Sequence, residues 1–188
     1  MLKLFKFWWE EAKWAYQQDP SCTSVIQAFL LFPGIKARRY HTLIHWLYRR
    51  QHLFLARWVS ERAKTKTGID IHPGAQIGHH LFIDHGTGVV IGETAIIGNR
   101  VTIFHGVTLG GTGKEKGIKR HPTVESDVIL GAGATVLGNI TIGQGAKVGA
   151  GAVVLKSVPQ NVTAVGIPAK YYQTKDIPDN SVPPEWFI

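Results

Sequence analysis

The chain has 188 residues, a formal net charge of +8 and one cysteine, Cys22. A single cysteine excludes a disulfide within the chain, and this length favours one domain or one domain with an appendage. The sequence has no zinc-finger spacing, RNP motif or long Lys/Arg block, so the basic charge fits an anionic small molecule better than nucleic acid. Charged residues interrupt the N-terminal apolar residues, and the longest apolar run, near residues 25–32, is too short to span a bilayer. We therefore expect a cytoplasmic protein without a membrane partner.

The segment up to residue 67 predicts helices. Glycine is almost absent there, and Trp, Leu, Lys and Arg dominate. Asp19-Pro20 has the residues of a helix N-cap followed by the first helical position, and Pro33-Gly34 is expected to end the helix before it. Residues 35–51 then carry apolar side chains at helical spacing. We predict three or four helices in this region.

Residues 68–172 carry an aliphatic residue at every sixth position, often followed by glycine. A plain strand alternates with a period of two, so a six-residue period indicates short straight segments joined by tight corners. Three such segments make one triangular coil, in which the aliphatic side chains point inward and stack on those of the next coil. The repeating positions are Ile71, Ile77, Ile83, Val89, Ala95, Val101 and Val107, and then Val124, Leu130, Val136, Ile142, Val148 and Val154.

The period breaks between Val107 and Val124, whose numbers differ by 17. Because 17 is not a multiple of six, residues at about 110–122 must leave the coil as a loop, and such excursions often carry function. Residues 173–188 contain several prolines and predict an extended C-terminal tail. The predicted organisation is a helical region over residues 1–67, a catalytic β-helix over residues 68–172, and this tail.

Five stretches, in this order, resemble motifs of the serine O-acetyltransferase family of hexapeptide-repeat acyltransferases. They are Asp19-Pro20-Ser21; Asp70-Ile71-His72-Pro73; Asp84-His85-Gly86-Thr87-Gly88 running into Val90-Ile91-Gly92-Glu93-Thr94; Val107-Thr108-Leu109-Gly110-Gly111-Thr112-Gly113-Lys114; and Arg120-His121-Pro122. The resemblance covers about residues 19–172. It implies an α+β protein with a left-handed parallel β-helix, which moves an acetyl group from acetyl-CoA to L-serine in the first step of cysteine biosynthesis.

The sequence departs from the family pattern in two ways. Ser21 and Gly86 stand where many relatives have alanine. Most of the N-terminal helical extension of the larger relatives is missing, which puts their hexameric assembly in doubt. For this short form we expect a homotrimer with active sites between neighbouring prisms.

The resemblance assigns the general base to His85 and its orientation to Asp70. A hydroxyl is a poor nucleophile at neutral pH, so it needs a base, and imidazole is the usual one. Asp70 would hold the imidazole tautomer and stabilise the imidazolium. The alternatives are a surface histidine at a coil corner and a carboxylate that caps a turn.

L-Serine is a zwitterion, so its site needs both an anion and a cation. By resemblance, Asp19 and Asp84 face the ammonium group, and Arg120 binds the carboxylate through its planar fork. His121 lies near the reacting hydroxyl in the same scheme. Asp19 could equally be a plain helix cap, and Arg120 a solvated loop charge.

The long arm of acetyl-CoA needs a groove with exposed backbone, and no Walker-type loop is present to hold its phosphates. The resemblance places the arm at Gly111, Ala132 and Ala150, with Gly111 also a candidate donor to the thioester oxygen. Lys147 and Lys170 could meet phosphate or be solvated. No metal is expected.

Three alternatives to serine acetylation remain open. One is the same chemistry on another hydroxyl acceptor, although the Asp19 and Arg120-His121 motifs argue against it. Another is a trimeric zinc enzyme like the γ-class carbonic anhydrases, since histidines are frequent between residues 72 and 105. The last is a non-catalytic scaffold, which would release no thiol from acetyl-CoA.

The C-terminal residue, Ile188, predicts a partner. An apolar terminal residue with a free carboxylate on an extended tail is typical of a docking peptide. The family resemblance implies that Ile188 enters the active site of O-acetylserine sulfhydrylase, and it also implies feedback inhibition by L-cysteine. The alternative is a disordered tail, or one whose Trp186 and Phe187 cover an apolar patch on the prism.

Overall fold

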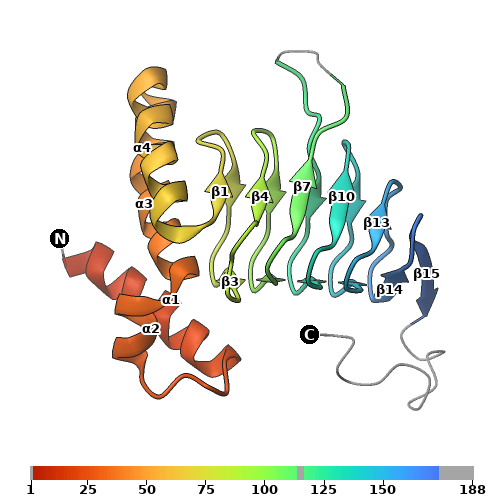
Figure 1. Cartoon of the computed structure of the whole chain (residues 1–188), viewed down its shortest axis with the longest axis horizontal. Coiled ribbons are helices and arrows are strands. Elements are labelled where there is room, and N and C mark those ends of the chain that lie inside the picture. The colour runs from red at the N-terminus through yellow and green to blue at the C-terminus, as the bar shows by residue number, and fades with distance from the viewer. Residues whose placement is uncertain (1, 114–116, 174–188) are drawn as a thin grey trace.

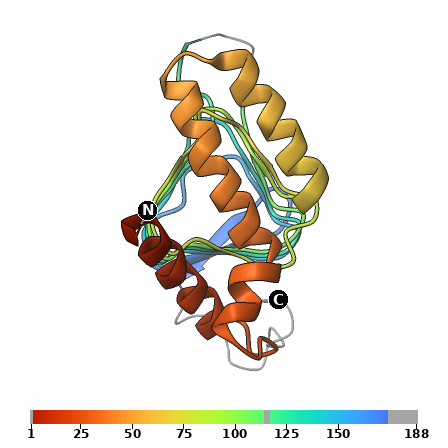
Figure 2. The same ribbon diagram turned by 90° about the vertical axis from the view of Figure 1, so that its left-hand side faces the viewer.

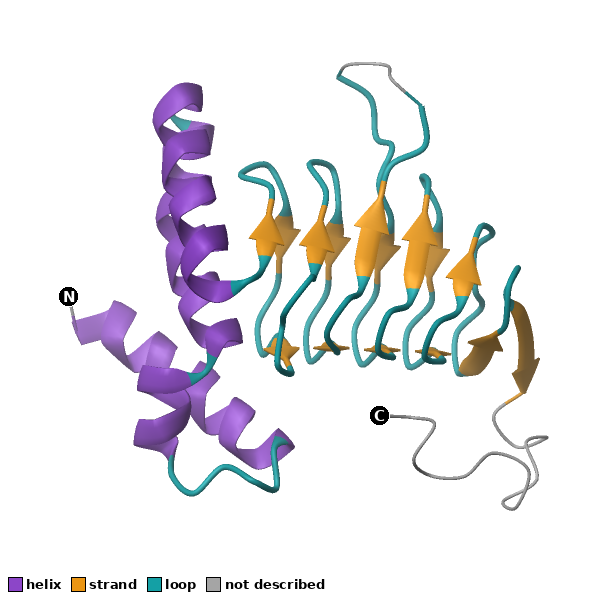
Figure 3. Ribbon diagram, in the orientation of Figure 1, coloured by secondary structure: helices purple, strands orange, loops and turns teal. Residues whose placement is uncertain are grey.

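The computed structural model describes residues 2–113 and 117–173 (Figure 1). Its N-terminal part contains four helices: α1 (Leu2–Gln18), α2 (Val25–Leu31), α3 (Pro33–Arg49) and α4 (Leu53–Thr67). These helices lie together at one end of a prism of short strands (Figure 3). No described helix is long and apolar enough to cross a membrane.

The strands form three sheets, which are the faces of a triangular prism when it is viewed along its axis (Figure 2). The first face contains β1 (Asp70–Ile71), β4 (Val90–Ile91), β7 (Thr108–Gly110), β10 (Thr135–Leu137) and β13 (Val153–Val154). The second contains β2 (Gln76–Ile77), β5 (Ile96–Ile97), β8 (Thr123–Val124) and β11 (Thr141–Ile142). The third contains β3 (Phe82–Ile83), β6 (Thr102–Ile103), β9 (Ile129–Leu130), β12 (Lys147–Val148), β14 (Val162–Val165) and β15 (Lys170–Gln173).

Two edges of this prism matter for the site. The loop edge joins the first face to the second and consists of the turns after β1, β4, β7 and β10; the segment between β7 and β8 leaves the prism here. The His85 edge joins the third face to the first and consists of the turns after β3, β6, β9 and β12. Adjacent strands pair in parallel, except that β14 and β15 are antiparallel.

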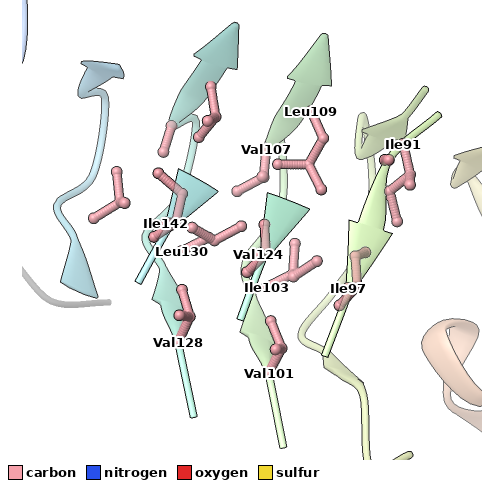
Figure 4. Close-up of a cluster of buried hydrophobic side chains, with 14 of the residues drawn as sticks. Ile91, Ile97, Val101, Ile103, Val107, Leu109, Val124, Val128, Leu130 and Ile142 are labelled. Atoms are coloured by element: carbon pink, nitrogen blue, oxygen red, sulfur yellow. The ribbon is translucent and has the colours of Figure 1, made fainter. Parts of the chain in front are cut away.

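The interior of the prism is a continuous column of aliphatic side chains (Figure 4). The predicted inward positions are buried from Ile71 to Val154, except Ile77, which is half-buried at the end of the prism that the helices cover. Each buried aliphatic side chain contributes about 1.5–3 kcal/mol through removal from water. The predicted left-handed parallel β-helix is thereby confirmed.

The first coil is longer than the predicted repeat. Most consecutive strands begin six residues apart, but β4 begins eight residues after β3, at 90 against 82. Accordingly, Ile71 pairs with Ile91, 20 positions on, whereas Val90 pairs with Thr108, 18 positions on. The prediction of one unbroken phase up to residue 107 is therefore wrong in this detail. Two extra residues occupy the turn of the His85 edge at residues 84–89.

One predicted helix boundary is also wrong, and another is confirmed. Asp19 follows the last residue of α1, and its Oδ1 accepts hydrogen bonds from the backbone N–H and hydroxyl of Ser21, at 2.8 and 2.7 Å. The N-cap of α2 is instead Ser24, whose hydroxyl accepts from the Gln27 N–H at 3.1 Å. The preceding helix does end before Pro33, as predicted, since α2 stops at Leu31; Pro33 also begins α3, because its fixed φ and missing N–H suit the first helical position.

The helices are joined to the first coil by close packing and buried polar contacts. Gly34 of α3 lies against β3, where a Cβ would come within 2.8 Å of the Ile83 carbonyl oxygen. Arg38 donates from Nη2 to the Gly78 carbonyl at 2.8 Å. The buried Glu11 carboxylate accepts the His80 N–H at 2.9 Å. These contacts fix the helices, and hence the residue after α1, relative to the strands.

Candidate functional site

His85 lies in the lengthened turn after β3, on the edge named after it. Its backbone has a φ of +55°, a left-handed conformation that costs energy for a non-glycine residue, and its side chain is 79% exposed. Its Nε2 lies 3.9 Å from Asp84 Oδ2, and its ring centroid lies 6.3 Å from that of His105 in the next coil. The turn with two extra residues thus contains His85, whose imidazole is exposed and open to an incoming ligand.

A pocket of about 390 Å³ lies on the third face of the prism beside this turn. Its lining includes Asp19, Asp84 and Lys147, three of the predicted site residues. The turn after α1 supplies Asp19, the turn after β3 supplies Asp84, and β12 supplies Lys147. Two carboxylates in one pocket form a place where an ammonium group would be stabilised.

Asp70 begins β1, and its partner comes from the helical region. Lys64 of α4 donates from Nζ to Asp70 Oδ2 at 2.7 Å. Within the described residues, no nitrogen of His85 lies within 4.0 Å of an Asp70 carboxylate oxygen. One chain therefore does not by itself form the predicted Asp70–His85 pair, and the pairing stays a prediction.

The loop edge holds a second polar cluster. Arg120 Nη2 donates to Glu93 Oε2 at 2.5 Å, and the Tyr48 hydroxyl donates to Glu93 Oε1 at 3.3 Å. Burial, followed by the charge of Glu93, raises the pKa of Tyr48. Burial lowers the pKa of Lys119, whose Nζ donates to the His121 carbonyl at 2.6 Å. The returning loop is thus tied to the turn after β4.

His121 is buried at this edge, with 8% of the residue exposed. Its ring lies over Gly92 and Gly111: a Cβ on Gly92 would collide with the ring, and a Cβ on Gly111 would come 3.0 Å from Nε2. Burial, and then the adjacent Arg120 guanidinium, holds the pKa of His121 below the ordinary value. Burial also lowers the pKa of His72, in the turn after β1.

The predicted acetyl-CoA positions divide between the same two edges. Gly111 follows β7 on the loop edge, whereas Ala132 and Ala150 lie in successive turns of the His85 edge, where the Gly151 N–H donates to the Ala132 carbonyl at 2.8 Å. Lys170 is exposed at the start of β15, at the far end of the prism.

The histidines do not form a metal centre within the described part of one chain. Across residues 2–113 and 117–173, no group of three His, Cys, Asp or Glu side chains is placed to hold a metal ion. His79 and His80 instead lie against the helices, where His79 contacts the Phe7 ring and His80 the Trp14 ring.

Sequence reasoning gave no role to Lys64, Tyr48, Glu93 and Thr94. Glu93 and Thr94 stand inside a quoted motif, but their contacts with the loop residues 119–121 join positions more than twenty residues apart. One signal was available: the two departures from the six-residue step before β13, eight residues from β3 to β4 and fifteen from β7 to β8, contain predicted site residues.

Comparison with known proteins agrees with this architecture. Residues 121–156 match the family model of the bacterial transferase hexapeptide (six repeats). The serine acetyltransferase of Bacillus licheniformis is 55% identical over 166 residues, which is 88% of this chain and 76% of that protein. The serine acetyltransferase of Helicobacter pylori is 56% identical over 160 residues, covering 85% of this chain and 92% of that protein.

Solved structures give the same result. The Brucella abortus serine acetyltransferase in complex with coenzyme A superposes with a TM-score of 0.85 at 43% identity, covering 91% of this chain and 68% of that one. The Neisseria gonorrhoeae serine acetyltransferase in complex with serine gives a TM-score of 0.84 at 43% identity, covering 90% and 69%. With this identity over most of its length, a matching fold and the predicted motifs at two edges of the prism, the chain belongs to the serine acetyltransferase family.

Proposed function

We propose that this protein transfers the acetyl group of acetyl-CoA to the hydroxyl of L-serine, giving O-acetyl-L-serine and CoA, at a site completed between neighbouring copies of the chain. The observation that carries the reaction is the identity of 55–56% to serine acetyltransferases over 85–88% of this chain. The product places the reaction at the first step of cysteine biosynthesis.

The reaction needs one base and one place for negative charge. His85 removes the proton from the serine hydroxyl while the hydroxyl oxygen attacks the thioester carbonyl carbon. The resulting oxyanion accepts a hydrogen bond, for which the Gly111 N–H is a candidate. When the C–S bond breaks, the departing sulfur of CoA takes up the proton from the His85 imidazolium. Asp70 would stabilise that imidazolium if assembly brings it within reach.

Serine binding uses charges of both signs. Asp19 and Asp84 line one pocket and would face the ammonium group. Arg120 would bind the carboxylate; Glu93 holds its guanidinium at 2.5 Å, and a guanidinium has five donors, so a second carboxylate can still bind. The acetyl-CoA arm would follow the turns that contain Ala132 and Ala150, with Lys147 or Lys170 toward its phosphates.

The separation of these groups favours a trimer. His85 and Asp84 lie on one edge of the prism, and Arg120 and His121 lie on another. In a ring with cyclic symmetry, an edge of each prism meets a different edge of its neighbour. A homotrimer would therefore place the base of one chain beside the carboxylate-binding arginine of the next, which a single chain cannot do.

Three finer features complete the proposal. The protein acts in the cytoplasm, L-cysteine competes with serine because it differs by one atom, and Ile188 docks in the active site of O-acetylserine sulfhydrylase. Ile188 lies outside the described residues, so its support is the sequence pattern alone.

The test is thiol release from acetyl-CoA with serine, compared with a panel of sugar and amino-alcohol acceptors. We expect release with L-serine to exceed that with every other acceptor. Faster release with another hydroxyl compound would reassign the substrate, and no release with any acceptor would favour a non-catalytic scaffold. Light scattering on the same sample should give three times the chain mass.

A further inference from the structure

Thr94, in the turn after β4, is the centre of the loop-edge hydrogen-bond network. Its hydroxyl oxygen accepts the backbone N–H groups of Arg120 and His121, at 3.0 and 3.1 Å. Its carbonyl accepts from Lys119 Nζ at 2.9 Å. One residue thus holds all three residues that end the returning loop, Arg120 and His121 through its side chain and Lys119 through its carbonyl.

The same residue contacts the imidazole of His121 twice. The Thr94 backbone N–H donates to His121 Nδ1 at 3.2 Å, and the Thr94 hydroxyl lies 2.9 Å from the same nitrogen. A backbone N–H can only donate, so Nδ1 must be an acceptor and cannot carry a proton. Because the hydroxyl oxygen already accepts two N–H groups, its own proton is directed to Nδ1 as well. The ring is therefore neutral, with its proton on Nε2.

The surroundings of His121 oppose a second proton. Burial of the ring, and then the charge of Arg120, lower its pKa; His72 and Lys119 act in the same direction, while Glu93 opposes them. Protonation at Nδ1 would also remove both hydrogen bonds from Thr94. The surrounding charges and the hydrogen bonds from Thr94 thus both favour a neutral His121 ring with its proton on Nε2.

We propose that Thr94 is a positioning residue that fixes His121 as a neutral imidazole whose Nε2–H donates to a substrate oxygen. The inference rests on the proposed function for the identity of that substrate. The ring lies over Gly92 and Gly111, whose missing side chains leave the space that the imidazole occupies. A donor fixed before substrate arrives needs no reorganisation during the reaction, and His121 in this tautomer cannot serve as the base.

His72 provides an internal reference for this idea. Its Nδ1 accepts the Gly74 N–H at 3.1 Å, so by the same argument its proton is on Nε2. This contact does not involve Thr94. A change at Thr94 should therefore alter the tautomer signals of His121 and leave those of His72 in place.

The test is ¹⁵N NMR of the full-length protein labelled at histidine, which distinguishes the two tautomers and the imidazolium. In the wild type at neutral pH we expect the proton of His121 on Nε2. Thr94→Val, which keeps the shape and removes the hydroxyl, should shift His121 toward a mixture of tautomers. It should also lower kcat by at least about tenfold, the value of the one hydrogen bond between the hydroxyl and the His121 ring, with the KM for acetyl-CoA little changed. Thr94→Ser should restore both signals.

The outcomes separate this proposal from the proposed function. A wild-type His121 that carries its proton on Nδ1, or that is an imidazolium at neutral pH, would overturn the positioning role whatever the substrate is. So would a Thr94→Val protein with unchanged tautomer and turnover. If serine proves not to be the acceptor while the wild-type tautomer is as expected, the positioning role of Thr94 stands and the substrate assignment fails. The wild-type measurement decides the matter even if the valine variant does not fold.

Discussion

The two edges of the prism that carry the site hold their histidines in opposite ways. His85 is 79% exposed, in a strained turn, with only the Asp84 carboxylate at 3.9 Å as a charged neighbour among the described residues. His121 is buried and held through its backbone and its ring by Thr94. A base must exchange its proton during turnover, whereas a donor serves best when it is fixed. This contrast fits the proposal that a neighbouring chain completes the site at the His85 edge, whereas the contacts of His121 at the loop edge are made within one chain.

The largest effect should come from removing the exposed histidine. His85→Ala is expected to lower kcat by about 10²-fold or more, the usual contribution of a positioned general base, while acetyl-CoA still binds. The matched variant is His105→Ala, one coil away on the same edge, which should lose far less. Steady-state kinetics with serine would check both. Turnover at the wild-type rate in His85→Ala would show that the base lies elsewhere.

The pH dependence separates the roles of the two histidines. In the acid limb, kcat/KM should drop by about tenfold per pH unit, because the reaction uses a single base. His121 should stay neutral over the same range, since its pKa is held low by burial and Arg120. A limiting slope of two in the acid limb would show that both histidines titrate together and would remove the contrast.

Arg120→Lys tests the cation of the loop edge. An ammonium group cannot reproduce the planar fork, so the KM for serine should rise by about tenfold with a smaller change in kcat. Arg100→Lys is the control: Arg100 also makes a bidentate pair, with Asp127 at 2.6 and 2.7 Å, but outside both site edges. Serine binding that is weakened equally by both substitutions would point to loss of structure rather than of the carboxylate site.

The smallest effect concerns a third kind of histidine, which is buried between the helices and the first coil. Burial, with the charges of Arg38 and His45, lowers the pKa of His41 to about 3. In the unfolded chain it titrates near 6.5, so between these values only the unfolded chain binds the proton. The contribution of His41 to the free energy of unfolding is therefore fully present above about pH 6.5. It falls by about 1.4 kcal/mol per pH unit below that value. Urea unfolding should show a steeper fall of stability with pH in the wild type than in His41→Gln, by about 1.4 kcal/mol per unit.

The regular part of the fold could be predicted because a six-residue period is repeated along the chain. The errors were in local details. Asp19 was predicted to be an N-cap, but the N-cap of α2 is Ser24, whose hydroxyl accepts a hydrogen bond from the third N–H of that helix. The two extra residues at 84–89 were not detected from the sequence. The apolar residues that immediately precede β4, β5, β6 and β7 continue the six-residue spacing that begins at Ile71.

The candidate site was predictable residue by residue through the family resemblance, but its partners were not. Lys64 reaches Asp70 from a helix, and Thr94 reaches His121 across 27 positions of sequence. Such contacts depend on how the elements lie in space, and no spacing rule along one chain gives them. The resemblance also did not indicate that, within one chain, the Asp70 carboxylate pairs with Lys64 rather than with His85.

The most direct test of a site shared between chains is complementation of two inactive variants. His85→Ala and Arg120→Ala proteins are each expected to be nearly inactive alone. When they are co-expressed, every mixed trimer has one interface at which an intact His85 meets an intact Arg120. Random mixing in equal amounts should therefore restore about a quarter of the wild-type activity, since about three quarters of the trimers are mixed and each has one intact site of three. No activity above the sum of the separate variants, in trimers shown by mass to contain both chains, would place the whole site within one chain and contradict the account.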